Sequence, residues 1–374
     1  MAPWQDAPRM RAAVTLEQCW HAVPGGTAVA ALELVRALDS RGDVDLVGVS
    51  ARHPQPPPEP WRPSIEVRRL WAPRALLYEL WHARLSLGTR VERATGPVDV
   101  VHGTAVAFPQ ADAPVVMTIH DLAFLDDPTL VTKHGLRFFR RGTDLAREHA
   151  RLVMCSSQAT IDDCVAAGFD KDRLRLVPLG VRSVPRDREA IDKARATFGL
   201  TRPYVMFNGT VEPRKNLRRL LTAFARVPRR DVDLVLVGPS GWNESLETEL
   251  APLEDRVHVL GFVARPELEA LLAGADVFCL PSLKEGFGLP VLEAMSQGAA
   301  VVTSAGTSTA EVAGDTALLV DPLDVGAIAN AIEELLDDRA LAERLSSAGK
   351  ARAATFTWER TAAATSAVYA EALA

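Results

Sequence analysis

The stretch Val277-Phe-Cys-Leu-Pro-Ser-Leu-Lys-Glu-Gly-Phe-Gly-Leu-Pro-Val-Leu-Glu293 joins a short apolar run to a turn and then to a helical pattern. The run from Val277 to Leu280 is typical of a strand buried in a parallel sheet. Gly286 and Gly288 let the backbone approach a ligand closely, and Pro290 suits the first position of a helix. The stretch therefore predicts a strand, a glycine-rich loop and a helix N-terminus, which together form a ready site for a diphosphate.

Two carboxylates flank this loop. Glu285 precedes it, and Glu293 is expected in the first turn of a helix over Pro290–Gln297. Carboxylates accept hydrogen bonds from sugar hydroxyls, so one can hold a ribose and the other a transferred sugar. The alternative is an ordinary strand-to-helix turn with two solvated acids. Because two glycines, a proline and two acids all fall where a sugar nucleotide needs them, the pattern favours a binding site.

A second strand-to-helix junction carries positive charge. Asn208-Gly-Thr-Val-Glu-Pro-Arg-Lys-Asn-Leu217 follows a predicted strand, Tyr204–Phe207, and Asn216 can cap the helix that comes next. Arg214 and Lys215 would then lie beside a helix N-terminus, where two cations can neutralise charge on a departing diphosphate. Taken alone, the motif also fits a basic surface turn.

Short apolar runs alternate with helical patterns along both halves of the chain, which is typical of parallel sheets covered on both faces. The other predicted strands are Ala12–Leu16, Asp45–Val49, Val98–Val101, Val115–Ile119, Leu152–Cys155, Val232–Val237, Val257–Leu260, Ala299–Thr303 and Ala317–Val320. The other predicted helices are Ala28–Leu38, Pro266–Ala273, a group from Val325 onward, and Trp358–Leu373. This order predicts an α/β protein of two doubly wound, Rossmann-like domains.

A polar segment with Pro185, Arg182 to Asp187, interrupts the alternation and suits a linker. We expect an acceptor-side domain over 1–182 and a nucleotide-sugar-binding domain over 183–356. The last residues, 357–374, are expected to form a helix that either caps the second domain or crosses back to the first. Two such domains place a cleft between them, and ligands bind outside the carboxyl ends of the strands.

Composition narrows the function. The chain has 374 residues, 48% hydrophobic and 24% charged, and a net charge of −6 argues against nucleic acid as the main partner. Its four cysteines lack metal-ligand spacing and are expected to be reduced and buried. The first residues lack an apolar signal core, and no apolar run reaches the roughly 20 residues that span a bilayer. We therefore expect a cytoplasmic protein, with peripheral contact to the inner face of the membrane left open.

Four motifs of the second half resemble a known family in their order and spacing. They are Gly209-Thr-Val-Glu-Pro-Arg-Lys-Asn216, Leu236-Val-Gly238, Gly261-Phe-Val263 and the Glu285–Glu293 stretch. Residues 204–322 resemble the C-terminal domain of retaining glycosyltransferase family 4, which has the GT-B fold.

The first half is more loosely similar to that family. The matching residues are Gly25-Gly-Thr27, Ile119-His-Asp121, Cys155-Ser-Ser157 and Val177-Pro-Leu-Gly180. The motifs His120-Asp-Leu-Ala-Phe-Leu125 and Glu212-Pro-Arg-Lys-Asn216 most resemble those of the mannosyltransferase-like branch of the family.

The resemblance assigns roles to single residues. Glu285 would contact hydroxyls of the donor sugar and Glu293 those of the ribose, while Arg214 and Lys215 would bind the diphosphate. His120 would lie near the 6-position of the sugar. The remaining donor-binding positions implied by the family are Gly25, Gly26, Thr210, Gly261, Phe262, Val263, Gly286, Phe287, Gly288 and Leu289.

Two positions depart from the family pattern. Many members carry arginine where this chain has Thr210, so phosphate binding is expected to depend more on Arg214. Many also carry proline where this chain has Ala310, before Glu311 and Val312, which is expected to change only local stiffness.

Several other residues have two readings. By itself, a histidine that ends a strand, as His120 does, is more often a structural hydrogen bonder; the family context favours a site role. His102 also ends a predicted strand and is either an acceptor-side contact or a loop anchor. Asp43-Val-Asp45 and Asp231-Val-Asp233 look like metal-binding motifs, but they stand at the starts of strands, away from the ligand edge. We expect no bound metal and no cofactor.

One aromatic and basic stripe recurs at roughly helical spacing. It comprises Trp71, Arg74, Leu77, Tyr78, Trp81, Arg84 and Leu85. The stripe is either a helix packed on the first sheet or a surface for a sugar acceptor or a membrane.

These observations predict a retaining, metal-independent hexosyltransferase. It would move a hexose, with mannose from GDP-mannose as the candidate donor, to the hydroxyl of a glycan or a lipid-linked acceptor in glycan, glycolipid or cell-envelope polysaccharide synthesis. The alternatives on the same fold are a sugar-nucleotide epimerase and a catalytically silent sugar-nucleotide-binding protein.

Overall fold

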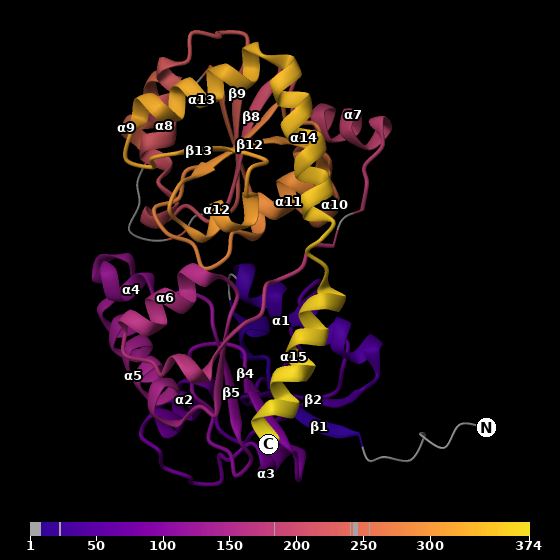
Figure 1. Cartoon of the computed structure of the whole chain (residues 1–374), viewed down its shortest axis with the longest axis vertical. Coiled ribbons are helices and arrows are strands. Elements are labelled where there is room, and N and C mark those ends of the chain that lie inside the picture. Colours follow the sequence, from indigo (N-terminus) through magenta and orange to yellow (C-terminus); the bar gives the residue numbers. More distant parts are fainter. Residues whose placement is uncertain (1–8, 22–23, 183, 240, 242–245, 254) are drawn as a thin grey trace, which may run out of the picture. The chain divides into compact units, whose positions relative to one another are not determined.

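The computed structural model describes residues 9–21, 24–182, 184–239, 241, 246–253 and 255–374. The chain forms two compact units, one of residues Met1–Gly180 with Trp358–Ala374, the other of residues Val181–Thr357. Each unit is a parallel sheet with helices on its faces (Figure 1). The predicted pair of Rossmann-like domains is thereby confirmed. The sequence placed the divisions at 182/183 and 356/357; the structure places them at Gly180/Val181 and Thr357/Trp358.

The first unit contains a seven-stranded sheet in the order β3-β2-β1-β4-β5-β6-β7. Its strands are β1 Met10–Thr15, β2 Val44–Ser50, β3 Val67–Arg69, β4 Val100–Gly103, β5 Val115–Ile119, β6 Leu152–Cys155 and β7 Leu174–Leu176. Its helices are α1 Gly25–Arg41, α2 Arg74–His82, α3 Glu92–Thr95, α4 Ala123–Asp126, α5 Lys133–His149, α6 Gln158–Ala166 and α15 Trp358–Leu373, with 3₁₀ turns η1 Glu17–Trp20, η2 Pro128–Leu130 and η3 Lys171–Arg173.

Alternating strand residues fill two hydrophobic layers in this unit. Val100 and Val116 pack with α1 and α15 on one face, and Val101 and Met117 pack with α2 and α5 on the other. The last helix, α15, lies against α1 (Figure 1), and Tyr369 on α15 is fully buried. Helix α15 thus belongs to the hydrophobic layer that also contains α1, although about 180 residues of chain separate it from β7.

The second unit contains a six-stranded sheet in the order β10-β9-β8-β11-β12-β13. Its strands are β8 Tyr204–Asn208, β9 Asp233–Val237, β10 Val257–Gly261, β11 Val277–Leu280, β12 Ala300–Ser304 and β13 Leu318–Val320. Its helices are α7 Arg188–Thr197, α8 Leu217–Arg226, α9 Glu247–Leu250, α10 Arg265–Ala273, α11 Leu289–Gln297, α12 Ser308–Ala313, α13 Val325–Asp337 and α14 Arg339–Ala353, with 3₁₀ turns η4 Pro213–Lys215 and η5 Ala251–Leu253.

One predicted strand begins later than expected. The sequence favoured Val98–Val101, whereas β4 runs over Val100–Gly103. The reason is local, because the side chain of Asp99 accepts a hydrogen bond from the backbone N–H of Arg11 at 2.7 Å. The carboxylate of Asp99 therefore links the start of β4 to β1.

Candidate active site

The chain order reverses at one place in each sheet. In the second unit β8 lies between β9 and β11, so the connections from β8 and from β11 leave the same edge in opposite directions. A parallel sheet opens a crevice at such a point, just beyond the carboxyl ends of its strands. The loop after β8 carries Arg214 and Lys215, and the loop after β11 carries Glu285. The topology thus brings together the two motifs that the sequence singled out.

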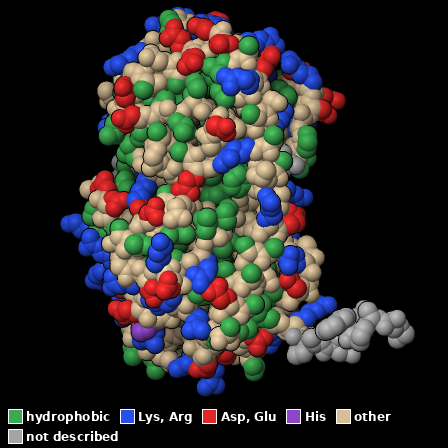
Figure 2. Space-filling model, viewed as in Figure 1, with side chains coloured by type: hydrophobic (Ala, Val, Ile, Leu, Met, Phe, Trp, Pro, Cys, Tyr) green, Lys and Arg blue, Asp and Glu red, His purple; other side chains and the backbone are tan. Residues whose placement is uncertain are grey.

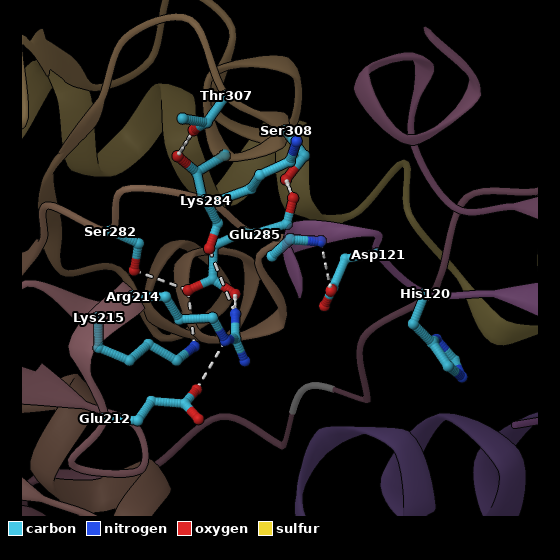
Figure 3. Close-up of polar contacts among 12 residues, drawn as sticks. His120, Asp121, Glu212, Arg214, Lys215, Ser282, Lys284, Glu285, Thr307 and Ser308 are labelled. Carbon is cyan, nitrogen blue, oxygen red and sulfur yellow. Dashed lines mark hydrogen bonds and ion pairs between the residues drawn. The ribbon is translucent and has the colours of Figure 1, made fainter. Parts of the chain in front are cut away.

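Glu285 lies at the centre of a buried polar cluster (Figure 3). One carboxylate oxygen accepts hydrogen bonds from Lys215 Nζ at 2.6 Å and from Ser282 Oγ at 2.7 Å. The other accepts from Arg214 Nη1 at 2.8 Å. Arg214 also pairs through Nε with Glu212 at 2.7 Å. Two cations and two carboxylates therefore balance one another at the edge where a ligand would bind.

The electrostatics of this cluster favour the ionised carboxylate. Burial alone would raise the pKa of Glu285, but the charges of Lys215 and Arg214 and the hydrogen bonds from Lys215 and Ser282 lower it to about 2. Burial lowers the pKa of Lys215 from its ordinary value, and the neighbouring charge of Arg214 acts in the same direction, against the opposing effect of Glu285. An incoming anion would supply the positive pair with a further counter-charge.

The glycine-rich loop is held by a side chain of α12 and by the conformation of one glycine. The hydroxyl of Ser308 donates to the carbonyl oxygen of Glu285 at 2.7 Å. Gly288 adopts a φ of +104°, and a Cβ at this position would lie 2.8 Å from the Thr309 side chain. Glycine is required there for both reasons. Helix α11 then begins at Leu289, so its N-terminal dipole points toward the loop.

Glu293 lies one residue further into its helix than predicted. Since α11 begins at Leu289, Pro290 takes the second helical position, and Glu293 takes the fifth, just past the first turn. The sequence predicts Pro290 at the first helical position, whereas Gly288 is the N-cap and the helix starts one residue earlier. Glu293 is mostly buried and accepts a hydrogen bond from Nη1 of Arg265, the first residue of α10.

Asn216 does not cap its helix through its side chain, contrary to the prediction. It adopts a left-handed conformation with φ +60°, and its amide donates to the carbonyl oxygens of Pro281 and Pro322, at 2.9 and 2.7 Å. The side chain therefore fastens the loop after β8 to the segments that follow β11 and β13. This fixes the two neighbouring cations relative to Glu285.

The remaining donor-side positions follow strands β8 and β10. Thr210 is partly exposed on the loop after β8. Gly261 ends β10 with φ +66°, after which Phe262 is 65% exposed and Val263 is buried. Gly238 N–H donates to the carbonyl oxygen of Gly261 at 2.8 Å, which ties the ends of β9 and β10 together. Phe287, within the glycine-rich loop, is buried and packs edge-on against Phe356.

The first unit carries the other predicted site residues. Gly25 and Gly26 open α1, and Gly25 has φ +61° with open space around its Cβ position. His120 follows β5, is partly buried, and its Nε2 lies 3.1 Å from the carbonyl oxygen of Thr104. Burial lowers the pKa of His120, so its imidazole is held in the neutral form more readily than a free histidine.

His102 is a structural anchor. It is fully buried, and its two ring nitrogens lie 2.7 Å from Tyr369 Oη and 2.7 Å from Thr118 Oγ1. Burial lowers the pKa of His102 to about 3. Of the two readings that the sequence left open, the structure supports the anchor, and the anchored element is α15.

Aspartates of both Asp-x-Asp motifs pair with arginines. Asp43 is hydrogen-bonded by Arg41, and Asp231 by Arg229, each beside the start of a strand. Asp233 pairs with Arg202. The prediction that these acids serve the starts of strands is confirmed. Within the described ranges, no group of three or more His, Cys, Asp or Glu side chains is placed to hold a metal ion.

The aromatic stripe divides into buried residues on α2 and exposed residues that flank this helix. Leu77 and Trp81 are buried in the first core, and Trp81 Nε1 donates to the carbonyl oxygen of Thr89 at 2.8 Å. Trp71 precedes α2 and Leu85 follows it, and they are 50% and 52% exposed. The packed-helix reading therefore holds for Leu77 and Trp81 and does not extend to Trp71 and Leu85. In the part of the chain that the structure describes, no helix combines the length and apolar character needed to cross a membrane.

Sequence reasoning missed two groups that hold the candidate site. Ser282 and Ser308 fix the side chain and backbone of Glu285. Arg265 contacts Glu293 across two helices. The only signal in the sequence was the place of these residues just after the strands, since hydroxyls and a single arginine are common at such positions.

Two family models match the chain. The model described as "Glycosyltransferase Family 4" matches residues 24–183, and "Glycosyl transferases group 1" matches residues 188–352. The chain is 33% identical over 270 residues to "O-antigen chain mannosyltransferase B" of Escherichia coli, covering 70% of this chain and 71% of that protein. It is 32% identical over 353 residues to "MMP alpha-(1->4)-mannosyltransferase" of Mycolicibacterium hassiacum, covering 85% and 82%.

The fold is also similar to that of solved structures. HepE of Anabaena, solved in complex with UDP and glucose, superposes with a TM-score of 0.77 at 20% identity, over 97% of this chain and 100% of that chain. At this level of identity, the likeness concerns the fold, which is GT-B.

Proposed function

Because this chain belongs to glycosyltransferase family 4, we propose that it transfers a hexose from a nucleotide diphosphate sugar to an acceptor hydroxyl with retention of configuration. The observation that carries the proposal is the cluster of Glu285, Arg214 and Lys215 at the strand edge of the second unit. Two fixed cations beside a helix N-terminus suit a diphosphate, and a buried ionised carboxylate suits sugar hydroxyls.

The proposed step is a displacement on one face of the sugar. The bond from the anomeric carbon to the diphosphate oxygen breaks while the acceptor oxygen forms its bond to that carbon on the same face. The acceptor proton passes to the departing diphosphate. Arg214, Lys215 and the N-terminus of α11 stabilise the negative charge that develops on that leaving group. Glu293 holds the ribose hydroxyls, and Glu285 orients the transferred sugar.

For the donor we propose GDP-mannose. Two relatives at 32% and 33% identity are named as mannosyltransferases. These names support mannose as the transferred sugar and do not specify the base of the nucleotide. A direct assay would follow release of nucleotide diphosphate from GDP-mannose, UDP-glucose and ADP-glucose, with and without a panel of glycan and lipid-linked acceptors. We expect acceptor-dependent release from GDP-mannose. Turnover of UDP-glucose but not of GDP-mannose would contradict the proposed donor. No turnover with any combination of donor and acceptor would contradict the proposed activity.

The same assay separates the alternatives. A sugar-nucleotide epimerase would release nucleotide without any acceptor, and a silent binding protein would bind a donor but release nothing. The ionised Glu285 and its two cations favour a working transferase over a silent protein. Retention would be read from the product anomer by NMR, where inversion at the anomeric carbon would contradict the one-face displacement.

We further propose that turnover needs no divalent metal, since Arg214, Lys215 and the α11 N-terminus supply the positive potential that a metal would otherwise provide. Turnover would be measured with EDTA and again after addition of Mn²⁺. Equal rates are expected. Abolition by EDTA with recovery in Mn²⁺ would contradict the proposal.

For the acceptor side we propose peripheral contact with an anionic membrane surface. Helices α2 and α5 pack together through Tyr78 and Phe138, whose rings stack at 5.3 Å. Lysine and arginine side chains gather over α5 (Figure 2), where Lys133, Arg137 and Arg140 are exposed. A group of exposed basic side chains suits an anionic interface.

Vesicle sedimentation would test this surface. Wild type should bind vesicles with phosphatidylglycerol better than neutral ones. The pair Arg137→Gln and Arg140→Gln should lose that preference while keeping its melting temperature, and Arg339→Gln, an exposed arginine on α14 in the second unit, is the control. Equal binding by all three proteins would contradict membrane contact at α5.

A further inference from the structure

A chain of charged side chains connects Glu293 to the start of the second unit. Arg265 Nη1 donates to Glu293, and Arg265 Nε donates to Glu269 at 2.6 Å. Glu269 is in turn bonded by Nε of Arg186 at 3.1 Å. The four residues lie on α11, on α10 and on the segment between Val181 and α7. Two arginines and two carboxylates thus alternate along one continuous path.

The path is buried in its middle. Glu269 is 3% exposed, which is rare for a carboxylate unless both oxygens have partners, and here each oxygen faces a different arginine. Burial disfavours the charge on Arg265, but the charge of Glu293 and the bonds to Glu269 and Glu293 outweigh it, so the pKa of Arg265 is raised. The guanidinium therefore stays charged and in place.

The connecting segment is fastened at three points to the same two helices. The carbonyl oxygen of Arg182 accepts from Arg265 Nη2 at 3.3 Å, and that of Val184 accepts from Gln297 Nε2 at 3.3 Å. The third point is Arg186 on Glu269. These are the helices that carry Arg265 and Glu293, so the backbone of the segment and the candidate ribose carboxylate share one set of bonds.

Glu293 is only half engaged by this network. Oε1 takes the bond from Arg265, whereas Oε2 has no hydrogen-bond partner among the described residues, and the side chain keeps 12% exposure. A carboxylate with one oxygen fixed and the other open is preorganised to accept bonds from a ligand. An unrestrained glutamate would have to lose rotamer freedom at the moment of binding.

We infer that Arg265 is a positioning residue for the nucleotide, one that acts through Glu293 and is itself held by Glu269 and Arg186. This inference rests on the proposed function, because it takes Glu293 as the residue that binds ribose hydroxyls. It adds that the ribose contact is set by a guanidinium on a neighbouring helix. The predicted signature is a defect that depends on the ribose hydroxyls.

The test compares a nucleotide with and without those hydroxyls. Calorimetry would give Kd for GDP and for 2′,3′-dideoxy-GDP on wild type, Arg265→Met and Glu269→Gln. Arg265→Met should weaken GDP roughly 3- to 10-fold, the loss expected when one side chain is no longer preorganised. Its affinity for the dideoxy analogue should match that of wild type. Glu269→Gln should show the same pattern with a smaller loss.

Controls separate positioning from two simpler explanations. Arg188→Met removes an arginine that is 83% exposed on α7, and it should change neither Kd. If Arg265 merely attracted the diphosphate, or merely stabilised the fold, Arg265→Met would weaken both nucleotides equally, and the inference would be overturned. Arg265→Lys should recover only part of the loss, since an ammonium cannot bridge two carboxylates as a guanidinium fork does.

The outcome for wild type distinguishes this inference from the function on which it rests. Wild type that binds neither nucleotide would contradict the proposed donor site. Wild type that prefers GDP over its dideoxy analogue, together with an Arg265→Met variant that keeps the same preference, would leave the donor site standing and overturn the role of Arg265 alone.

Discussion

At the scale of single residues, the second unit keeps a lysine ammonium out of water. Lys215 is 6% exposed, and its charge is balanced by Glu285 at 2.6 Å. Burial of either charge costs desolvation free energy, and the attraction between the two charges offsets that cost. Loss of one partner therefore leaves the other buried without compensation. Arg214 adds a second cation to the same carboxylate. The site is therefore arranged for an anion and depends on Glu285 until one arrives.

Removal of that carboxylate charge should destabilise the protein. We expect Glu285→Gln to lower the free energy of unfolding by about 3–5 kcal/mol, because Lys215 is left buried without its main counter-charge. The double variant with Lys215→Met should lose less. Glu343→Gln, which breaks an exposed pair on α14, should change stability by less than about 1 kcal/mol. Urea unfolding would give the free energy of unfolding of each variant. Equal losses in Glu285→Gln and in Glu343→Gln would contradict the buried pair.

The same carboxylate gives a pH dependence of known sign. The folded-state pKa of Glu285 is lowered from 4.5 to about 2, so the ionised form is the stabilised one. Its contribution is fully present above pH 4.5 and is lost as the pH falls from 4.5 toward 2. The difference in unfolding free energy between wild type and Glu285→Gln should stay constant near neutral pH and shrink below 4.5. A difference that shrinks already at neutral pH would contradict the lowered pKa.

Sequence reasoning reached the key residues but not their pairing. The sequence indicates Arg214, Lys215 and Glu285 because each follows a predicted strand, and parallel strands end at one edge. That the cations contact Glu285 itself depends on β8 and β11 being neighbours, which apolar runs do not reveal. Arg265 was missed for the same reason, since its partner Glu293 lies on another helix 28 residues away.

At the scale of elements, the loop before α11 depends on one glycine. In Gly288→Ala, a Cβ would lie 2.8 Å from Thr309 in a backbone with φ +104°, so we expect a loss of about 1–3 kcal/mol and weaker GDP binding. Gly199→Ala is the matched control, with φ +68° and open space around the Cβ position. It should leave GDP binding unchanged. Unaltered GDP binding in Gly288→Ala would contradict the role given to this loop.

Helix α2 makes a separate prediction. Trp81 is 2% exposed and its indole N–H is satisfied by Thr89, so Trp81→Ala should reduce the free energy of unfolding by about 3–5 kcal/mol. Leu87→Ala, at a position 67% exposed, should change it by no more than about 0.5 kcal/mol. Thermal unfolding followed by circular dichroism would compare them. A small effect of Trp81→Ala would return this residue to the surface reading.

Two short strands escaped prediction for a physical reason. β3 is Val67–Arg69 and β7 is Leu174–Leu176, each three residues long and each containing arginine. They are the outer strands of the first sheet, so only one edge of each is paired and no apolar run is needed. The inner strands, buried on both faces, carry the continuous apolar runs that the sequence displays.

At the scale of the whole molecule, the chain is two Rossmann-like units, each built on a parallel sheet. The alternation of strands and helices sufficed to predict this architecture. The path of α15 could not be read from its own sequence, where both routes were open. Its place in the first unit rests on tertiary contacts, including the bond between Tyr369 and His102 at 2.7 Å.

The central claim, that the second unit binds a nucleotide through Glu293 and orients a transferred sugar through Glu285, is tested most directly by calorimetry with GDP. Glu293→Ala should raise Kd about 10- to 150-fold, the equivalent of one charge-assisted contact of roughly 1.5–3 kcal/mol. Glu285→Ala, measured where it remains folded, should keep GDP affinity close to that of wild type and lose kcat instead, because GDP lacks the sugar. Equal loss of GDP affinity in both variants would contradict this division of roles, and no loss in either would contradict the site.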